Sequence, residues 1–152
     1  MSNQIVRNQN FCRYITYLGD EKHPLSLDLK NVSPMKVLNE NFRFTIYDED
    51  VIKDNKIMIF FNPIEHDFRS PSMSIEIFQI DLVVPNKDWV IKQGADVELR
   101  AYSIMNELAQ QIDQQNVAGV GKVEISQSRV QSINKGYSII SAMITVANSK
   151  GA

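Results

Sequence analysis

Apolar and polar residues alternate most regularly in the stretch SIEIFQIDLVVPNKDW, from Ser74 to Trp89. A period of two predicts a strand whose alternate side chains point to opposite faces. One face is apolar throughout: Phe78, Ile80, Leu82 and Val84. The other face changes from apolar to polar along the strand: Ile75 and Ile77, then Gln79 and Asp81. Pro85 ends the strand, because proline cannot donate to a ladder of backbone hydrogen bonds.

A mostly apolar run, KIMIFFNPI, begins at Lys56 and predicts a second strand that is covered on both faces. Pro63 and the polar residues EHDFRSPS then mark a connection. We expect the two strands to form a long hairpin with a polar tip at Glu65, His66 and Asp67.

Spacings of three and four residues predict one main helix after the connection NKDWVIKQGAD. In DVELRAYSIMNELAQQIDQQN the apolar residues recur on one face: Val97, Ala101, Ile104, Leu108 and Ile112. This pattern is typical of an amphipathic helix of about five turns, with Asp96 as its cap. NVAGVG ends the helix. Two strands, KVEISQSRVQS and YSIISAMITVAN, then close the chain around a tight turn at Asn134-Lys135-Gly136.

The first 55 residues predict short strands and turns, with one short helix. FCRYITYL (residues 11–18) and FRFTIY (residues 42–47) are typical of strands, and HPLSLDLK alternates leucines with polar residues. SPMKVLNE favours a helix, with Ser33 as N-cap and Pro34 at the first helical position.

Together these elements predict an α+β fold, an antiparallel sheet with a long hairpin and one main amphipathic helix packed on it. We expect a single domain over residues 1–152, with a variable strand-rich part at 1–55 and a core at 56–148. The length of 152 residues allows a substantial core, and a hydrophobic content of 43% is ordinary for a globular protein.

Composition makes several classes of protein poor candidates. The net charge is -2, Lys and Arg are scattered, and the densest charged cluster, YDEDVIKD, is acidic, so we do not expect tight binding to duplex DNA. No apolar run approaches the roughly 20 residues that span a bilayer. The sequence MSNQIVRNQNF lacks the apolar region of a signal peptide. The single cysteine, Cys12, excludes an intrachain disulfide and fits a reducing cytoplasm.

The residues that could carry chemistry form no catalytic or metal-binding signature. GVGK, residues 119–122, follows a helix and precedes a strand, the reverse of a phosphate-binding loop, so a helix end is favoured. In an extended chain the side chains of Glu65 and Asp67 point away from that of His66, which favours a polar hairpin tip over a metal site. Cys12 as a nucleophile would need a histidine base, and a small buried hydrophobe is favoured. We expect no enzyme, no metal and no cofactor.

Trp89 lies in a polar connection, beside Val90 and Ile91. A tryptophan in this position commonly closes the edge of a core, but tryptophan is also enriched at binding hot spots. Both interpretations stay open. The candidate interface residues form two groups: Lys87, Asp88 and Trp89, and Glu65, His66 and Asp67.

From Lys56 to Asn148, the last two-thirds of the chain resembles tail-terminator and neck proteins of tailed bacteriophages. The shared order is a long hairpin, a connection leading to a helix, and a closing pair of strands. The most similar residues are F-x-I-D-L-V-V-P (78–85), which runs toward Trp89, and INKGYSIISAMITV (133–146). Proteins of that group often begin with a helix packed on the sheet, and the strands predicted for residues 1–55 depart from this pattern.

The resemblance implies a structural virion protein that forms a ring, commonly of six subunits, at the head-proximal end of the tail. Such a ring ends the tail tube and joins it to the head. The implied partners are other copies of the chain, the tail-tube protein and connector or neck proteins. DNA would pass through without specific binding, and no membrane is involved. The implied location is the tail or neck of the virion, after assembly in the cytoplasm of the bacterial host.

Two other classes of function are weighed against this one. A small non-catalytic α+β module could bind a protein, or hold an apolar ligand between sheet and helix, which requires a concave apolar interior. An enzyme would require His23, His66 and Cys12, or the carboxylates, to come together in the fold. We rank structural assembly first, the binding module second and the enzyme third.

Overall fold

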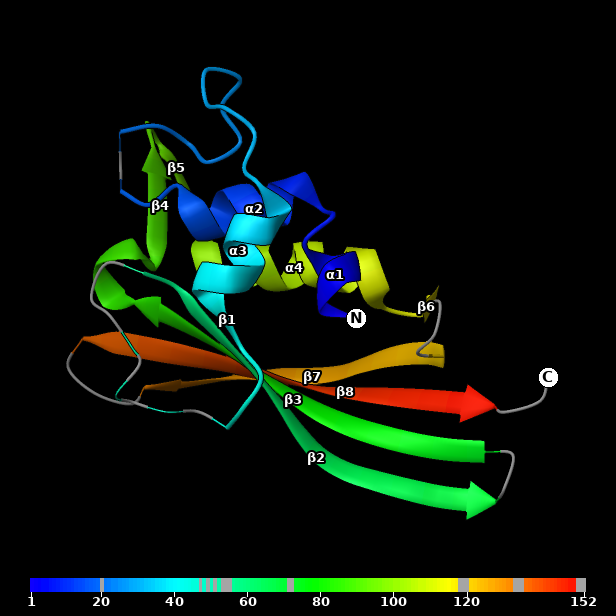
Figure 1. Ribbon diagram of the computed structural model, residues 1–152. Helices are drawn as coiled ribbons and strands as arrows, with labels where there is room; N and C mark the ends of the chain where they lie inside the picture. Colours follow the sequence, from blue (N-terminus) through cyan, green and yellow to red (C-terminus); the bar gives the residue numbers. More distant parts are fainter. Residues whose placement is uncertain are drawn as a thin grey trace.

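The computed structural model describes residues 1–19, 21–46, 48, 50, 52, 56–70, 73–117, 121–132 and 136–149. The chain forms two layers, a long twisted sheet and a group of helices on one of its faces (Figure 1). The α+β class predicted from the sequence is confirmed.

Within the described residues, the main sheet has six strands in the order β1-β2-β3-β8-β7-β6. Their bounds are β1 Phe42–Arg43, β2 Met58–Ser70, β3 Met73–Pro85, β6 Asn116–Val117, β7 Gly121–Ser132 and β8 Tyr137–Ser149. β1 runs parallel to β2, and the other pairs are antiparallel, so the sheet is mixed. The predicted long hairpin is confirmed as β2 and β3, and the two closing strands as β7 and β8.

Four helices, α1 (Ser2–Ile5), α2 (Gln9–Thr16), α3 (Pro34–Asn41) and α4 (Arg100–Ile112), lie on the same side of the sheet (Figure 1). α4 is the predicted amphipathic helix, and Ala101, Ile104, Leu108 and Ile112 are buried as its spacing predicts. It begins at Arg100, so Asp96 does not cap it. Val97 instead lies in a strand and is 66% exposed.

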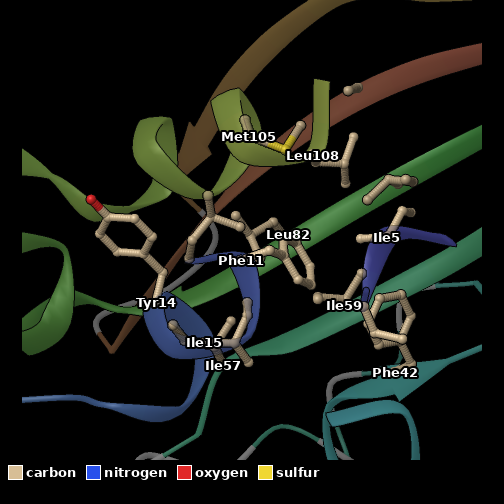
Figure 2. Packing of buried hydrophobic residues seen from close by; sticks show 14 of the residues in the cluster. Ile5, Phe11, Tyr14, Ile15, Phe42, Ile57, Ile59, Leu82, Met105 and Leu108 are labelled. Carbon is tan, nitrogen blue, oxygen red and sulfur yellow. The ribbon is translucent and has the colours of Figure 1, made fainter. Parts of the chain in front are cut away.

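The main core fills the space between the helices and the sheet. Figure 2 shows Phe11 of α2 beside Leu82 of β3, with Met105 and Leu108 of α4 packed nearby. A second, smaller cluster lies on the opposite face of the sheet, near the start of β2: Ile52, Met58, Phe60, Val83 and Ile139. The apolar side of β3 predicted from its alternation therefore faces the helices.

The prediction of strands in the first 55 residues is wrong for most of that segment. Residues 11–18, predicted as a strand, lie largely in α2, which begins where the Asn8 side chain accepts a hydrogen bond from the Phe11 backbone N–H. A short apolar run has no periodicity long enough to separate helix from strand. The capping asparagine is a signal that favours the helix. The helix predicted at SPMKVLNE is confirmed as α3, with Ser33 as its N-cap and Pro34 at its start.

The alternating leucines of HPLSLDLK do not form a strand, because these residues lie in bends and turns. Leu27 is 98% exposed. This loop is held by a buried arginine and not by backbone hydrogen bonds to another strand. The guanidinium of Arg13 donates hydrogen bonds to the carbonyls of Pro24, Ser26 and Leu29. In FRFTIY only Phe42–Arg43 is strand, and Tyr47 lies outside the described residues.

The connections predicted after Pro63 and after Pro85 are wrong, because regular structure continues in both places. β2 continues through Pro63 to Ser70, with a bulge between Pro63 and Glu65. Within the part of the chain that the structure describes, β1 pairs with β2 at Ile59 and Phe60 alone, so Pro63 lies on an edge where proline need not donate a hydrogen bond. After β3, the turn η2 (Asn86–Asp88) leads into a two-stranded ribbon formed by β4 (Val90–Gln93) and β5 (Asp96–Leu99). Asn134 and Lys135 of the predicted tight turn lie outside the described residues.

The two leucines Leu82 and Leu27 provide a matched test of this core. Leu82→Ala should lower the free energy of unfolding by about 2–5 kcal/mol, because Leu82 is only 1% exposed and its loss leaves a cavity. Leu27→Ala should change it by less than about 0.5 kcal/mol. Urea unfolding followed by circular dichroism measures both. Equal losses would mean that Leu27 is buried, as the alternation of HPLSLDLK predicts.

Candidate functional site

One end of the sheet extends past the helices, and this distal end consists of the last residues of β2, the first of β3 and the last of β8 (Figure 1). β2 and β3 each have 13 residues and pair from Met58–Val83 to Ser70–Met73. β8 continues the pairing along the whole of β3, to Met73–Ser149. The sheet is therefore longer than the helical layer that covers it.

The face of the sheet opposite the helices changes character along its length. Near the start of β2 it is apolar and buried in the smaller cluster. In the middle, Asp81 accepts hydrogen bonds from Gln79 (2.7 Å) and Ser141 (2.5 Å). At the distal end apolar side chains return, partly or largely exposed, with Glu65 and Thr145 on either side of Ile77. These apolar residues are Met73, Ile75, Ile77 and Met143, called here the distal outer face. The change from apolar to polar predicted along β3 is confirmed.

A groove opens around the bulge at Pro63 in β2, called here the distal groove. It has a volume of about 350 Å³ and six lining residues: Pro63, Ile64, Glu65, His66, Glu76 and Phe78. The bulge at Pro63 displaces the register by one residue, and Ile64 is 47% exposed. Glu76 lies opposite His66, whose Nδ1 is 2.9 Å from Glu76 Oε1, while Glu65 lies opposite Ile77 on the other face of the strand pair. The groove thus combines apolar walls with a carboxylate on each side.

Two of the candidate interface residues at the predicted hairpin tip, Glu65 and His66, line this groove. They lie within β2 and before its end at Ser70, so they are not at the tip. Asp67 belongs to the same strand, but its side chain lies outside the described residues.

The second group of candidate residues lies at the other end of β3. Lys87 is exposed, Trp89 packs partly buried against the main core, and Asp88 is buried. The carboxylate of Asp88 accepts a hydrogen bond from the Gly19 backbone N–H (3.1 Å), so it has a structural role. Nine residues along β3 separate the two groups, roughly 30 Å in an extended strand. They do not form one site.

Arg100 is a fully buried arginine at the start of α4. Its Nε donates to the Asp88 carbonyl (2.8 Å), and its Nη1 donates to the carbonyls of Tyr14 (2.9 Å) and Tyr17 (3.0 Å). These hydrogen bonds join the C-terminal end of α2, the turn after β3 and α4. They fix the β4–β5 ribbon relative to the helices.

A polar cluster centred on Glu98 holds the ribbon to the helical layer. The Glu98 carboxylate accepts hydrogen bonds from Tyr14, Ser103 and His23, and His23 Nε2 lies 2.6 Å from its Oε2. Burial opposes the ionisation of Glu98, but these three hydrogen bonds outweigh it and hold its pKa below 4.5. Burial, together with the hydrogen bond to Glu98 and its charge, raises the pKa of Tyr14.

The geometry of this cluster suits a structural role. The Leu25 backbone N–H donates to His23 Nδ1, so Nε2 carries the proton that His23 donates to Glu98. Both ring nitrogens are therefore engaged. Ser103 donates to Glu98 and not to a histidine, so the serine and the imidazole do not form a nucleophile–base pair.

The sequence analysis missed the Glu98 cluster and the β4–β5 ribbon. The stretch VIKQGADVEL does carry a hairpin signal, two four-residue alternating segments around Gly94, whose φ is +61°. The partners of Glu98 come from α2, α4 and the loop at residue 23, and no spacing in the sequence connects them.

The remaining candidates for chemistry are few. Cys12 is buried, its Sγ lies 3.1 Å from the Val6 carbonyl oxygen, and burial raises the pKa of its thiol to about 11. Among the residues with described positions, no group of three or more His, Cys, Asp or Glu side chains is placed to hold a metal ion. No helix in the described part of the chain is long and apolar enough to cross a membrane.

A comparison with protein-family models matches residues 8–146 to the family described as YomW. The matched region runs from the start of α2 into β8, so it includes α2, α3 and α4 as well as most of the sheet. No curated protein matches the chain.

Glu98→Gln tests the polar cluster through its pH dependence. Because the pKa of Glu98 is lower in the folded state than the ordinary 4.5, its ionised form stabilises the fold above about pH 4.5. That contribution is lost as the pH falls through the folded-state pKa. We expect Glu98→Gln to cost about 1 kcal/mol at pH 7, a low value for bonds to a charged group because Glu98 is partly exposed.

Urea unfolding of both proteins from pH 7 to below pH 4 measures this difference. Glu124→Gln, at an exposed position on β7, is the matched control and should show no such loss. A cost for Glu98→Gln that stays constant in acid would contradict the assigned role of the charge.

Proposed function

The chain belongs to the YomW family, which is phage-associated, and from this premise and the form of its sheet we propose that it is a structural protein of a phage tail. In this proposal, copies of the chain form a ring at the head-proximal end of the tail. The ring ends the tail tube and joins it to neck or connector proteins. It would assemble in the host cytoplasm, and DNA would pass through it without specific binding.

The observation that carries the proposal is the sheet that extends beyond its helices. Its distal outer face presents Ile75, Ile77 and Met143 to solvent in part, and Met73 is 48% exposed. An exposed cluster of apolar side chains on a sheet is typical of a site that another protein covers. We assign this face to the tail-tube protein.

The helices α1, α2 and α3 also support the proposal. The strands predicted for residues 1–55 departed from the resemblance to tail-terminator proteins, many of which begin with a helix packed on the sheet. Residues 2–41 instead contain three helices, and α2 packs beside α4 over the sheet (Figure 1). In this respect the chain is therefore similar to the tail-terminator proteins that begin with a helix.

The described edges of the sheet favour contact through faces over the addition of strands. Pro63 and its bulge interrupt the open edge of β2, and a second bulge lies between Ile125 and Ser128 in β7. Natural sheets use prolines and bulges of this kind to prevent edge-to-edge pairing.

A ligand-binding module, the alternative, needs an apolar space between sheet and helix. Here the sheet residues that face the helices, such as Ile80, Leu82 and Ile144, are at most 1% exposed and belong to one cluster with Phe11 and Ile104. Protein side chains occupy this layer, which favours the assembly function.

Ile77→Lys tests the assigned surface. With the tail-tube protein encoded in the same phage genome, the wild type should form a complex of defined mass in light scattering. Ile77→Lys should bind the tube protein about tenfold more weakly or worse, because burying an ammonium in an apolar contact costs more than the ~1.4 kcal/mol that equals tenfold, even with Glu65 opposite it. Met35→Lys places the same charge at an exposed position of α3, and this variant should bind the tube protein like the wild type.

Circular dichroism of each variant shows whether it is folded, since Ile77 is partly exposed and a lysine there can extend to solvent. A wild-type chain that stays monomeric both alone and with the tube protein would overturn the proposed function.

A further inference from the structure

The β4–β5 ribbon has two different faces, set by its register. Ile91 pairs with Glu98 on the inner face, where Ile91 is buried and Glu98 joins the polar cluster. On the outer face, Lys92 pairs with Val97, and both are exposed. The neighbouring pair on that face, Val90 and Leu99, is partly buried. The outer face is thus an apolar strip with one cation.

The distal groove has the complementary chemistry. Pro63, Ile64 and Phe78 provide apolar walls, and Glu65, which pairs with Ile77 across the strands, provides an exposed carboxylate at the rim. Glu76 lies on the other face of the strand pair, 2.9 Å from His66. The volume of about 350 Å³ accepts a small number of side chains, of the size of a valine and a lysine stem. The Glu65 carboxylate would pair with an ammonium held at the rim.

The β4–β5 ribbon follows the C-terminal end of β3 at Pro85 (Figure 1), whereas the groove lies at Glu76 and Phe78, seven or more residues back along that strand, which is roughly 23 Å or more. They therefore cannot meet within one chain, but they can meet between two copies. Two different complementary surfaces on one chain produce a heterologous, head-to-tail contact, which closes into a ring when the rotation between copies allows it.

We propose that the β4–β5 ribbon of one copy docks into the distal groove of the next copy. Val97 enters the groove beside Ile64 and Phe78, and Lys92 pairs with Glu65. The inference rests on the proposed function, because it supplies the contact between subunits of the ring. The ribbon suits this role because Arg100 and Glu98 hold it rigidly against the helices.

Charge reversal tests the pairing. Lys92→Glu or Glu65→Lys should raise the protein concentration needed for assembly by about tenfold or more, because like charges then face each other in the contact. The double variant Glu65→Lys/Lys92→Glu restores opposite charges in every contact and should assemble like the wild type. Lys36→Glu, on α3, changes the net charge by the same amount as Lys92→Glu. It is the matched control for that variant and should have no effect.

Disulfide trapping tests the geometry independently. In the double variant Ile64→Cys/Val97→Cys, mild oxidation should link neighbouring copies into a ladder of bands on a non-reducing gel. Each single variant can form only a dimer. The native Cys12 should not interfere, because it is fully buried and its raised pKa keeps it as the unreactive thiol.

The outcomes separate the two proposals. If the wild type assembles but charge reversal leaves its assembly unchanged and the cysteine pair gives no ladder, the ribbon–groove contact is wrong and the ring function stands. If the wild type stays monomeric both alone and with the tube protein, both proposals are overturned. Loss of assembly in the charge-reversal variants, recovery of assembly in the double variant and a disulfide ladder together support the ribbon–groove contact.

Discussion

Apolar packing of four helices against one face of a long sheet determines the rest of this structure. Phe11 and Leu108 bury the helix-facing residues of β3 and β8, and this cluster holds the chain together. The helices cover one face of the sheet and are shorter than its strands, so two surfaces stay open toward the distal end. One is the distal outer face, on the side away from the helices, and the other is the groove beside Pro63. Both functional proposals follow from this incomplete cover.

A buried arginine and a partly buried carboxylate position the second contact surface. Arg100 joins the end of α2 to the turn after β3, and Glu98 binds side chains from α2, α4 and the loop at His23. Each group satisfies its partners inside the fold, and together they orient the β4–β5 ribbon with Lys92 and Val97 outward. A rigid ribbon loses little conformational entropy on docking, which favours its use as a contact between subunits.

The sequence predicted those parts of the fold that long, regular patterns encode. Alternation in β3 and β8 predicted the sheet and its hairpin. The spacing of three and four residues in α4 predicted the main helix. The first 55 residues could not be predicted in this way. The apolar run 11–18 is too short to show its period, and the leucines of HPLSLDLK alternate in a loop held by the buried Arg13. The groove could not be predicted either, because it depends on a bulge at Pro63 and on a cross-strand neighbour, Glu76.

The central claim is that the chain forms a ring that ends a phage tail tube, and electron microscopy of tail tubes assembled with the protein tests it most directly. The account predicts a ring of density at one end of each tube, and tubes that stop lengthening once the ring is bound. Bare tube ends, with tubes that lengthen equally in the presence and absence of the protein, would contradict it.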